Sequence, residues 1–423
     1  MTERRILLAI CLTLLLTSVG RGGEEVLIDG ALHVQNPAQP TLALETYELE
    51  ELWRVGAEDD DLFFGLIVAV RIDEAGNILL LDETLSQVFV LSPTGELIAT
   101  LSRPGEGPGE TQSPNDLVLL PNGRIGIAHG TSGRLVTLDR DGNPTGDIHV
   151  NRSDPGQGGM TLLRNVNAGG GNLVFGSVDM GVNQKTGFPT REVVLASHDM
   201  DGRRLATYHQ RDTQFEFDPF GFSEKKNLEF DNYRFGVGPD GRVYCATEHD
   251  PYKVMVYNMD GTVDRIITRT HETVMRSPAE YEAMVNLFDS ALRREVPPPF
   301  DLEVARNEPA ICWLQRGLQI AQDGRLWILP SSGVRNQPDG IYQTFDVFTT
   351  DGHFEKQVAI AGEGDPREDA VFLAGPDHLV RILGFADALL TKVGGSGGSE
   401  DEEAEPIQAV YYRMKPVRDR TAP

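Results

Sequence analysis

One unit recurs along most of the chain, and this internal repeat constrains the fold more than any other feature. Each copy has an apolar segment of strand length, a turn with Asp or Asn beside Gly, a second apolar segment, a variable connection, a third strand and another glycine turn. Clear copies span 72–101, 119–150, 237–269 and 320–360, a degenerate copy ends at Tyr208, and a last one begins at Gly375. Such turns between apolar segments at matching offsets are typical of antiparallel strands.

Four short antiparallel strands in a repeat of roughly 40 residues predict one blade of a β-propeller. The copies therefore predict an all-β, six-bladed β-propeller of four-stranded antiparallel blades, because a blade buries both faces only between neighbours in a ring. The last copy lacks an outer strand, whereas the strand-like segment 44–55 precedes the first copy. We expect this N-terminal strand to close the ring by completing the last blade.

The predicted propeller occupies residues 44–416, after an N-terminal extension at 21–43 and before a C-terminal tail at 417–423. It carries one helical insertion at about 272–312, where Ser277 and Glu280 are spaced as a capping box with Pro278 at the first helical position. A Gly/Ser-rich stretch followed by acidic residues predicts a flexible acidic loop at 394–406.

Residues 1–20 predict a secretory signal peptide. Arg4 and Arg5 form its basic start, 6–16 its apolar core, and Ser18 and Gly20 the small residues before the cleavage site. The apolar run is shorter than the about 20 residues of a membrane-spanning helix, and no later segment is a transmembrane candidate. A lipoprotein would instead use Cys11, which lies within the apolar core. We expect a secreted or periplasmic monomer.

The formal net charge of −26 argues against nucleic acid and anionic lipid surfaces as partners. Besides Cys11, the chain contains Cys245 and Cys312. An exported compartment permits a disulfide between them, but two separately buried thiols are the favoured interpretation. The sequence has no HExxH, CxxC or P-loop motif, so we assign no catalytic residue.

Residues 105–143 contain a glycine-rich approach, a proline-led inner strand and Asp-Gly turns. In these features the units resemble NHL repeats, and the likeness extends over about 44–416 as a pattern. The chain is also similar to exported bacterial six-bladed propellers whose fifth blade carries DGRLW and a DVF-type strand, here 323–327 and 346–348. Such propellers include binding modules, lyases and lactonases, so the resemblance implies a fold and leaves the function open.

The run Ser113-Pro114-Asn115-Asp116 opens an inner strand. It resembles gluconolactonase-like propellers, in which the Asn of a Pro-Asn-Asp run binds Ca²⁺ in the central channel. This family's first blade opens with a metal-binding Glu, whereas residues 63–67 here are FFGLI, and Ca²⁺ requires six to eight oxygen ligands. The alternative interpretation is that the side chains of Asn115 and Asp116 form hydrogen bonds within a turn and bind no metal. We predict no cofactor, and Ca²⁺ belongs only to a metal-dependent alternative.

Aligning the copies places polar residues at similar depth where the inner strands begin. Their arginines, amides and carboxylates could hold an anionic or carbohydrate-like ligand by charge-assisted hydrogen bonds. Alternatively, these groups could form hydrogen bonds and ion pairs with one another. These candidate residues are Asn115, Asp116, Arg164, Asn232, Tyr233, Arg234, Gln315, Arg316 and Asp369.

The favoured hypothesis is an exported, non-catalytic binding scaffold that holds a protein, peptide or glycan at the channel mouth. The alternative is a lactonase- or amidating-lyase-like propeller enzyme with a divalent metal in the channel. An enzyme of that kind requires at least three ligands that converge on one point, whereas a scaffold requires only a chemically mixed rim.

Overall fold

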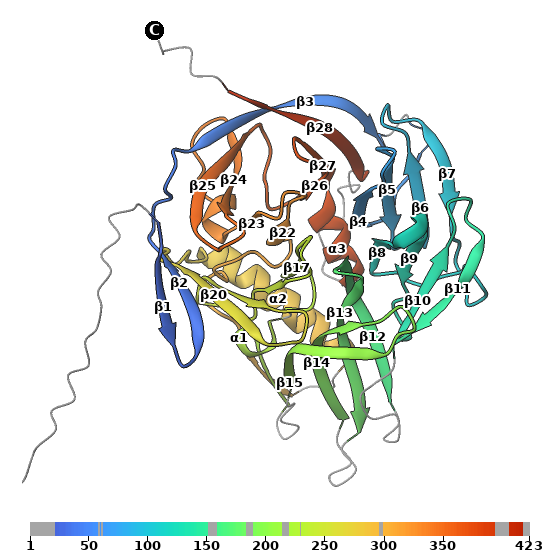
Figure 1. Ribbon diagram of the computed structural model, residues 1–423, viewed down its shortest axis with the longest axis horizontal. Coiled ribbons are helices and arrows are strands. Elements are labelled where there is room, and N and C mark those ends of the chain that lie inside the picture. The colour runs from blue at the N-terminus through green and yellow to red at the C-terminus, as the bar shows by residue number, and fades with distance from the viewer. Residues whose placement is uncertain are drawn as a thin grey trace, which may run out of the picture.

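The computed structural model describes residues 22–57, 60, 62–150, 159–182, 189–213, 220–228, 230–295, 299–393 and 406–417. The predicted signal peptide and nearly all of the predicted acidic loop lie outside the described residues. Within them the chain is all-β with few helices, and its strands form four-stranded antiparallel units arranged around a ring (Figure 1). No helix of these residues is long and apolar enough to cross a membrane.

Successive units follow the order of the chain. The first comprises β4 (Ile67–Ile72), β5 (Ile78–Asp82), β6 (Gln87–Leu91) and β7 (Leu97–Leu101). The second comprises β8 (Asp116–Leu119), β9 (Ile125–Ala128), β10 (Arg134–Leu138) and β11 (Pro144–His149). The third comprises β12 (Met160–Gly169), β13 (Asn172–Val182), β14 (Pro189–His198) and β15 (Arg204–Thr213).

The later units have the same antiparallel order. The fourth comprises β17 (Phe235–Val237), β18 (Val243–Cys245), β19 (Lys253–Tyr257) and β20 (Val263–Arg269). The fifth comprises β22 (Leu318–Ile320), β23 (Leu326–Ile328), β24 (Ile341–Phe348) and β25 (Phe354–Ala361). The last contains β26 (Ala370–Leu373), β27 (His378–Leu383) and β28 (Gln408–Pro416). The first strands β4, β8, β12, β17 and β22 contact one another in this order.

Asp-Gly pairs form the hairpin turns between the third and fourth strands of the second, third, fourth and fifth units. Gly142 and Gly261 have φ of 83° and 90°, which is the left-handed region that glycine enters without a steric penalty. In the second unit the Asp139 carboxylate accepts hydrogen bonds from the backbone N–H groups of Asp141 and Asn143 at 3.0 and 2.8 Å. The repeat in the sequence therefore reflects repeated turn geometry.

The apolar core is divided among the interfaces between neighbouring sheets. One cluster joins the first sheet to both the second and the last, for example through Ile67, Leu117 and Phe372. Further clusters join the second sheet to the third, the third to the fourth, the fourth to the fifth and the fifth to the last. Each sheet consequently packs on both neighbours, as a repeat that cannot bury its faces alone requires.

The N-terminal strand β3 (Glu45–Val55) lies beside the last strand of the chain (Figure 1). It pairs antiparallel with β28, from Val55 opposite Ala409 to Tyr47 opposite Pro416, and has a short parallel contact with β25. Trp53 is 8% exposed, and its ring centroid lies 5.3 Å from that of Tyr411. The segment 44–55 thus occupies the edge at which the sequence predicts an outer strand.

The extension 21–43, for which the sequence suggested no structure, contains a hairpin of β1 (Glu24–Ile28) and β2 (Ala31–Asn36). Strand β2 pairs in parallel with β20, so the fourth sheet has six strands. Asn36 is 4% exposed and fixes this edge, because its amide donates to the carbonyls of Thr268 and Gly352 at 3.1 and 2.9 Å.

The predicted insertion contains helix α2 (Pro278–Glu295). Its capping box is formed, since Glu280 accepts the Ser277 N–H at 2.8 Å and donates its own N–H to Ser277 Oγ at 3.3 Å. The sequence did not suggest the other short elements, which are α1 (Glu224–Asn227), α3 (Phe385–Val393), two 3₁₀ turns (Pro121–Gly123 and Ser331–Val334) and the parallel pair β16 (Phe220–Ser223) and β21 (Phe300–Glu303). Helices α2 and α3 contact each other and project onto the middle of the ring in Figure 1.

A buried ion pair anchors the insertion to the rest of the molecule. Glu224 is 3% exposed and accepts two hydrogen bonds from Arg276, at 2.8 and 2.7 Å, and one from the Ala305 N–H at 2.8 Å. Arg276 also donates to Glu308 at 3.0 Å. Burial alone would raise the pKa of Glu224, but the hydrogen bonds from Arg276 and the Ala305 N–H lower it to about 2.

Cys245 and Cys312 are both free and buried. Burial raises the pKa of each thiol to about 12, so both remain protonated at neutral pH. This confirms the interpretation of two separate thiols.

Candidate functional site

Several predicted residues converge where the inner strands begin. Asp116 of β8 is the centre of this group and is completely buried. Its carboxylate accepts hydrogen bonds from Arg71 Nη2 at 3.0 Å, from its neighbour Leu117 N–H at 2.8 Å and from the Val166 N–H of β12 at 2.9 Å. Because these donors come from three units, Asp116 ties the first, second and third sheets together at the channel.

Arg316 approaches the same carboxylate from the fifth unit, with Nη2 3.8 Å from Asp116 Oδ1. It donates to the Val68 carbonyl of β4 at 3.0 Å. Its guanidinium lies over the rings of Tyr233 and Phe372, 4.7 and 4.4 Å from their centroids. Its buried Nε has no hydrogen-bond partner. Burial lowers the pKa of Arg316 to about 10, so the side chain is still cationic at neutral pH.

Tyr233 supplies the fourth unit's contribution. It is 7% exposed, and its hydroxyl donates to the Val68 carbonyl at 3.3 Å. Burial raises the pKa of Tyr233, and the charges of Arg316, Arg164 and Arg71 oppose that rise. Three arginines and Asp116 therefore act electrostatically on this one hydroxyl.

Two of these residues have an unusual backbone conformation. Tyr233 and Arg316 have φ of 56° and 47°, and each lies two residues before the first strand of its unit. The left-handed conformation costs a non-glycine residue about 1–2 kcal/mol, and such conformations cluster at functional sites. The matching position in two units indicates that the fold maintains this geometry to direct both side chains into the channel.

Arg71 is the channel residue that the sequence prediction missed. It follows an entirely apolar run in β4 (Ile67–Ile72), and a charge within such a strand is the signal that could have revealed it. Arg71 also donates to the Val70 carbonyl at 2.9 Å, and its side chain remains 20% exposed. It is the more accessible of the two arginines that contact Asp116.

Arg234 does not face the channel mouth in this structure. It is completely buried, and its guanidinium donates to backbone carbonyls, at 2.9 Å for Ala246, 2.8 Å for Glu248 and also to Ile311. Its physical role is to satisfy the carbonyls of two neighbouring units. The alignment places it beside Tyr233, but the two side chains have different partners, since Tyr233 donates to the Val68 carbonyl and Arg234 to that of Ala246.

The other predicted residues are distributed around the same rim. The Asn115 amide donates to the Leu163 carbonyl at 2.6 Å, and the Gln315 amide donates to the Arg367 carbonyl at 2.8 Å. Asp369 accepts from the Tyr342 hydroxyl at 2.9 Å and pairs with Arg381 at 2.6 Å. Asn232 is partly exposed. These contacts position the loops around the channel.

The described residues contain no group of three or more His, Cys, Asp or Glu that could hold a metal ion. In the channel the oxygens of Asp116 already accept three N–H donors. A Ca²⁺ ion would require six to eight oxygen ligands, and this cluster is rich in donors instead. The donor set does not fit the metal that the gluconolactonase-like alternative requires.

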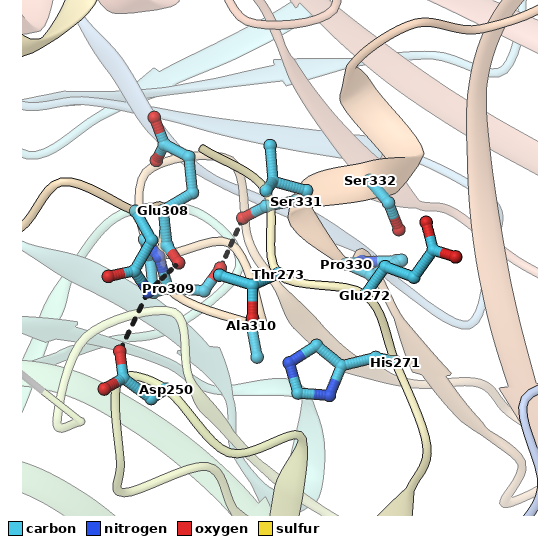
Figure 2. Close-up of a pocket in the computed structure, with 12 residues that line it drawn as sticks. Asp250, His271, Glu272, Thr273, Glu308, Pro309, Ala310, Pro330, Ser331 and Ser332 are labelled. Atoms are coloured by element: carbon cyan, nitrogen blue, oxygen red, sulfur yellow. Dashed lines mark hydrogen bonds between the residues drawn. The ribbon is translucent and has the colours of Figure 1, made fainter. Parts of the chain in front are cut away.

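A separate small pocket lies between the fourth and fifth units, lined by Asp250, His271, Glu308 and Ser331 among others (Figure 2). Its polar groups are engaged with neighbours. Asp250 accepts from Asn307 at 2.9 Å, and Ser331 Oγ donates to the Pro309 carbonyl at 2.5 Å. Burial opposes ionisation of Asp250, but hydrogen bonds from Asn307, Lys225 and His249 lower its pKa.

No protein family matches the chain in a family scan, and no curated protein sequence matches it. The NHL resemblance therefore stays a prediction. Similar solved structures include a protein of Bacteroides fragilis described as exported, 11% identical over 88% of this chain and 99% of that chain, with a TM-score of 0.48.

Two enzymes are also similar in structure. A luciferin-regenerating enzyme is 12% identical over 85% of this chain and 95% of its own, with a TM-score of 0.46. Virginiamycin B lyase of Staphylococcus aureus is 7% identical over 86% of this chain and 99% of its own, with a TM-score of 0.41. At these scores the likenesses carry no argument about function.

Proposed function

We propose that the chain is a six-bladed β-propeller closed by β3, and that it serves as an exported, monomeric binding scaffold without catalytic activity. The core clusters that link successive sheets, and the last sheet to the first, support the closed ring. The predicted signal peptide supports export. N-terminal sequencing of protein recovered outside the cytoplasm should begin near Arg21, and an intact Met1 would contradict export.

The ligand that fits the channel mouth is a protein, peptide or glycan with an acidic group. One observation carries this proposal: the guanidinium groups of Arg71 and Arg316 lie 3.0 and 3.8 Å from the same buried carboxylate, that of Asp116. Two guanidinium groups beside one carboxylate give this cluster a net positive charge, on a chain of net charge −26. Such a site attracts anions, and a carboxylate or sulfate forms charge-assisted hydrogen bonds with guanidinium groups.

Replacing Arg316 tests the proposal. We expect Arg316→Ala to weaken binding of sulfate and of trigalacturonate about 10- to 100-fold, because one charge-assisted hydrogen bond contributes about 1.5–3 kcal/mol. Isothermal titration calorimetry at low salt and in about 0.3 M salt measures this, and wild-type affinity should fall as salt rises.

Arg413→Ala is the matched control, since Arg413 pairs with Glu50 at 3.1 Å on the outer edge of the last sheet. This variant should bind sulfate and trigalacturonate with affinities within twofold of those of wild type. Arg316→Gln keeps more of the packing on Tyr233 and Phe372, so a melting temperature near that of wild type would exclude unfolding as the cause. Equal binding by wild type and both Arg316 variants would refute the anion site.

The metal-dependent enzyme remains the competing proposal, and it requires a divalent ion that these residues do not favour. Elemental analysis of purified protein for Ca and Zn distinguishes the two proposals. If the purified protein retained a stoichiometric metal through dialysis, the scaffold proposal would be abandoned in favour of the metal-dependent enzyme.

A further inference from the structure

The loop that carries Arg316 also carries an aromatic side chain. Residues 313–316 form the tip of a tight loop, because Gly317 returns so close to Cys312 that a Cβ on it would lie 1.9 Å from the Cys312 carbonyl oxygen. Trp313 and Arg316 are at opposite ends of this tip. Consecutive Cα atoms are 3.8 Å apart, so their backbones are separated by at most about 11 Å.

Helix α2 provides the second half of this aromatic surface. Phe288 of α2 stacks on Trp313, with centroids 6.4 Å apart and ring planes 13° apart, and Phe222 supports Phe288 from 5.0 Å. Both Trp313 and Phe288 remain partly exposed.

The start of α2 is fixed to the same rim. Glu280 accepts a hydrogen bond from Arg367 at 2.8 Å, and the Arg367 carbonyl accepts the Gln315 amide at 2.8 Å. The tip 313–316 and helix α2 are thus two parts of one wall beside the anion site.

We propose that Trp313 and Phe288 form an apolar subsite next to the arginine cluster, and that the ligand is an acidic oligosaccharide. This inference rests on the proposed function. One face of a pyranose ring consists of C–H groups, and covering them with an aromatic ring removes apolar surface from water. A uronic acid or sulfated sugar joins such a face to an anionic group, as the wall joins Trp313 to Arg316.

The exposure of the two rings favours a glycan over a peptide. Aromatic and aliphatic peptide anchors bind best in fully desolvated pockets, whereas Trp313 and Phe288 both keep part of their surface in solvent. A sugar ring can lie on such an open wall while its carboxylate reaches the guanidinium groups. The arginines then select the charge, and the aromatic rings select the carbohydrate.

The test compares two probes, trigalacturonate and sulfate, on Trp313→Ala, Phe288→Ala and Arg316→Ala. We expect Trp313→Ala to weaken the binding of trigalacturonate at least tenfold, while its affinity for sulfate stays within twofold of wild type. Phe288→Ala should also lose affinity for trigalacturonate but not for sulfate, and its loss should be smaller than that of Trp313→Ala. Wild-type tryptophan fluorescence should change on titration with trigalacturonate. The change should persist in Trp327→Phe and vanish in Trp313→Phe, which retains an aromatic ring and guards against misfolding.

The outcomes separate the two proposals. If Arg316→Ala weakens sulfate but Trp313→Ala and Phe288→Ala leave both probes unchanged, the aromatic subsite is refuted and the anion site stands. If Arg316→Ala affects neither probe, the anion site fails as well. If the acidic peptide Glu-Tyr-Glu binds more tightly than trigalacturonate and depends on Trp313, the ligand is a peptide and the glycan assignment is overturned.

Discussion

A truncated chain that begins at Gly56 is expected to lose cooperative unfolding and to aggregate. This truncation removes β3, which supplies the outer strand of the last sheet and pairs along β28 from Ala409 to Pro416. The edges of β28 and β25 would then be exposed, and unpaired strand edges are templates for association with other chains. Trp53, 8% exposed, would also leave the core, and loss of a large buried aromatic alone costs about 3–5 kcal/mol.

A second truncation that begins at Thr41 provides the control. It removes the hairpin β1–β2, which adds to the outer edge of the fourth sheet and contacts the fifth unit through Asn36, and it leaves β3 in place. We expect this shorter truncation to unfold in one transition and to stay monomeric in size-exclusion chromatography. Equal stability of the Gly56 truncation and the full chain in urea titrations would show that β3 does not close the ring.

Replacing Arg276 with Met is expected to lower the free energy of unfolding by about 3–5 kcal/mol, because removing one partner of a buried ion pair leaves an uncompensated charge. The affected charge is Glu224, which is 3% exposed. Urea unfolding at pH 7 measures the loss. Arg293→Ala is the control: its partner Asp289 lies one turn away on α2, its side chain is 55% exposed, and its loss should change stability by less than about 0.5 kcal/mol.

The effect of Arg276→Met depends on pH in a defined direction. Burial tends to raise the pKa of Glu224, but hydrogen bonds from Arg276 and the Ala305 N–H lower it to about 2 from its ordinary value of 4.5. The unfolded state therefore binds the proton more readily, so this contribution is complete above pH 4.5 and is lost as pH falls toward 2. The shift corresponds to about 3 kcal/mol, which agrees with the loss expected from breaking the pair.

The stability deficit of Arg276→Met should consequently be largest at pH 7 and should narrow as pH falls from 5 to 3. Adding Glu224→Leu should recover much of the lost stability at pH 7, because replacing both partners leaves no buried charge. A deficit that is independent of pH would show that Arg276 acts through packing alone.

The repeated units were predictable because their turn chemistry is encoded locally. An Asp or Asn beside Gly marks most of the tight hairpin turns, and the lengths of the apolar segments indicate the strands. The hairpin β1–β2, the pair β16–β21 and helix α3 do not repeat, so periodicity gave no signal for them. Strand β2, for example, depends on long-range pairing with β20 and on the Asn36 amide.

The candidate site was predictable only in part. The alignment correctly placed Asp116, Tyr233 and Arg316 near one another, because equivalent positions of successive units lie at similar depth. It could not separate Tyr233 from Arg234, since the choice of which neighbour faces the channel depends on a left-handed residue at Tyr233. That conformation is uncommon for an aromatic residue, and the sequence carries no marker for it.

The pairing of β3 with β28 also bears on the order of events after synthesis. Arg54 and Gln408, which hydrogen-bond across this pair, are 354 residues apart in the chain. Loop closure over such a separation is slow compared with hairpin formation, so local sheets can form early, whereas the final contact must wait for the C-terminal strand to be made. A nascent chain that lacks β28 cannot form this pair, so this edge of β3 stays unpaired until residues 408–416 have been made. Under the proposed export, this delay would keep β3 and β28 apart while the chain passes through a translocation pore.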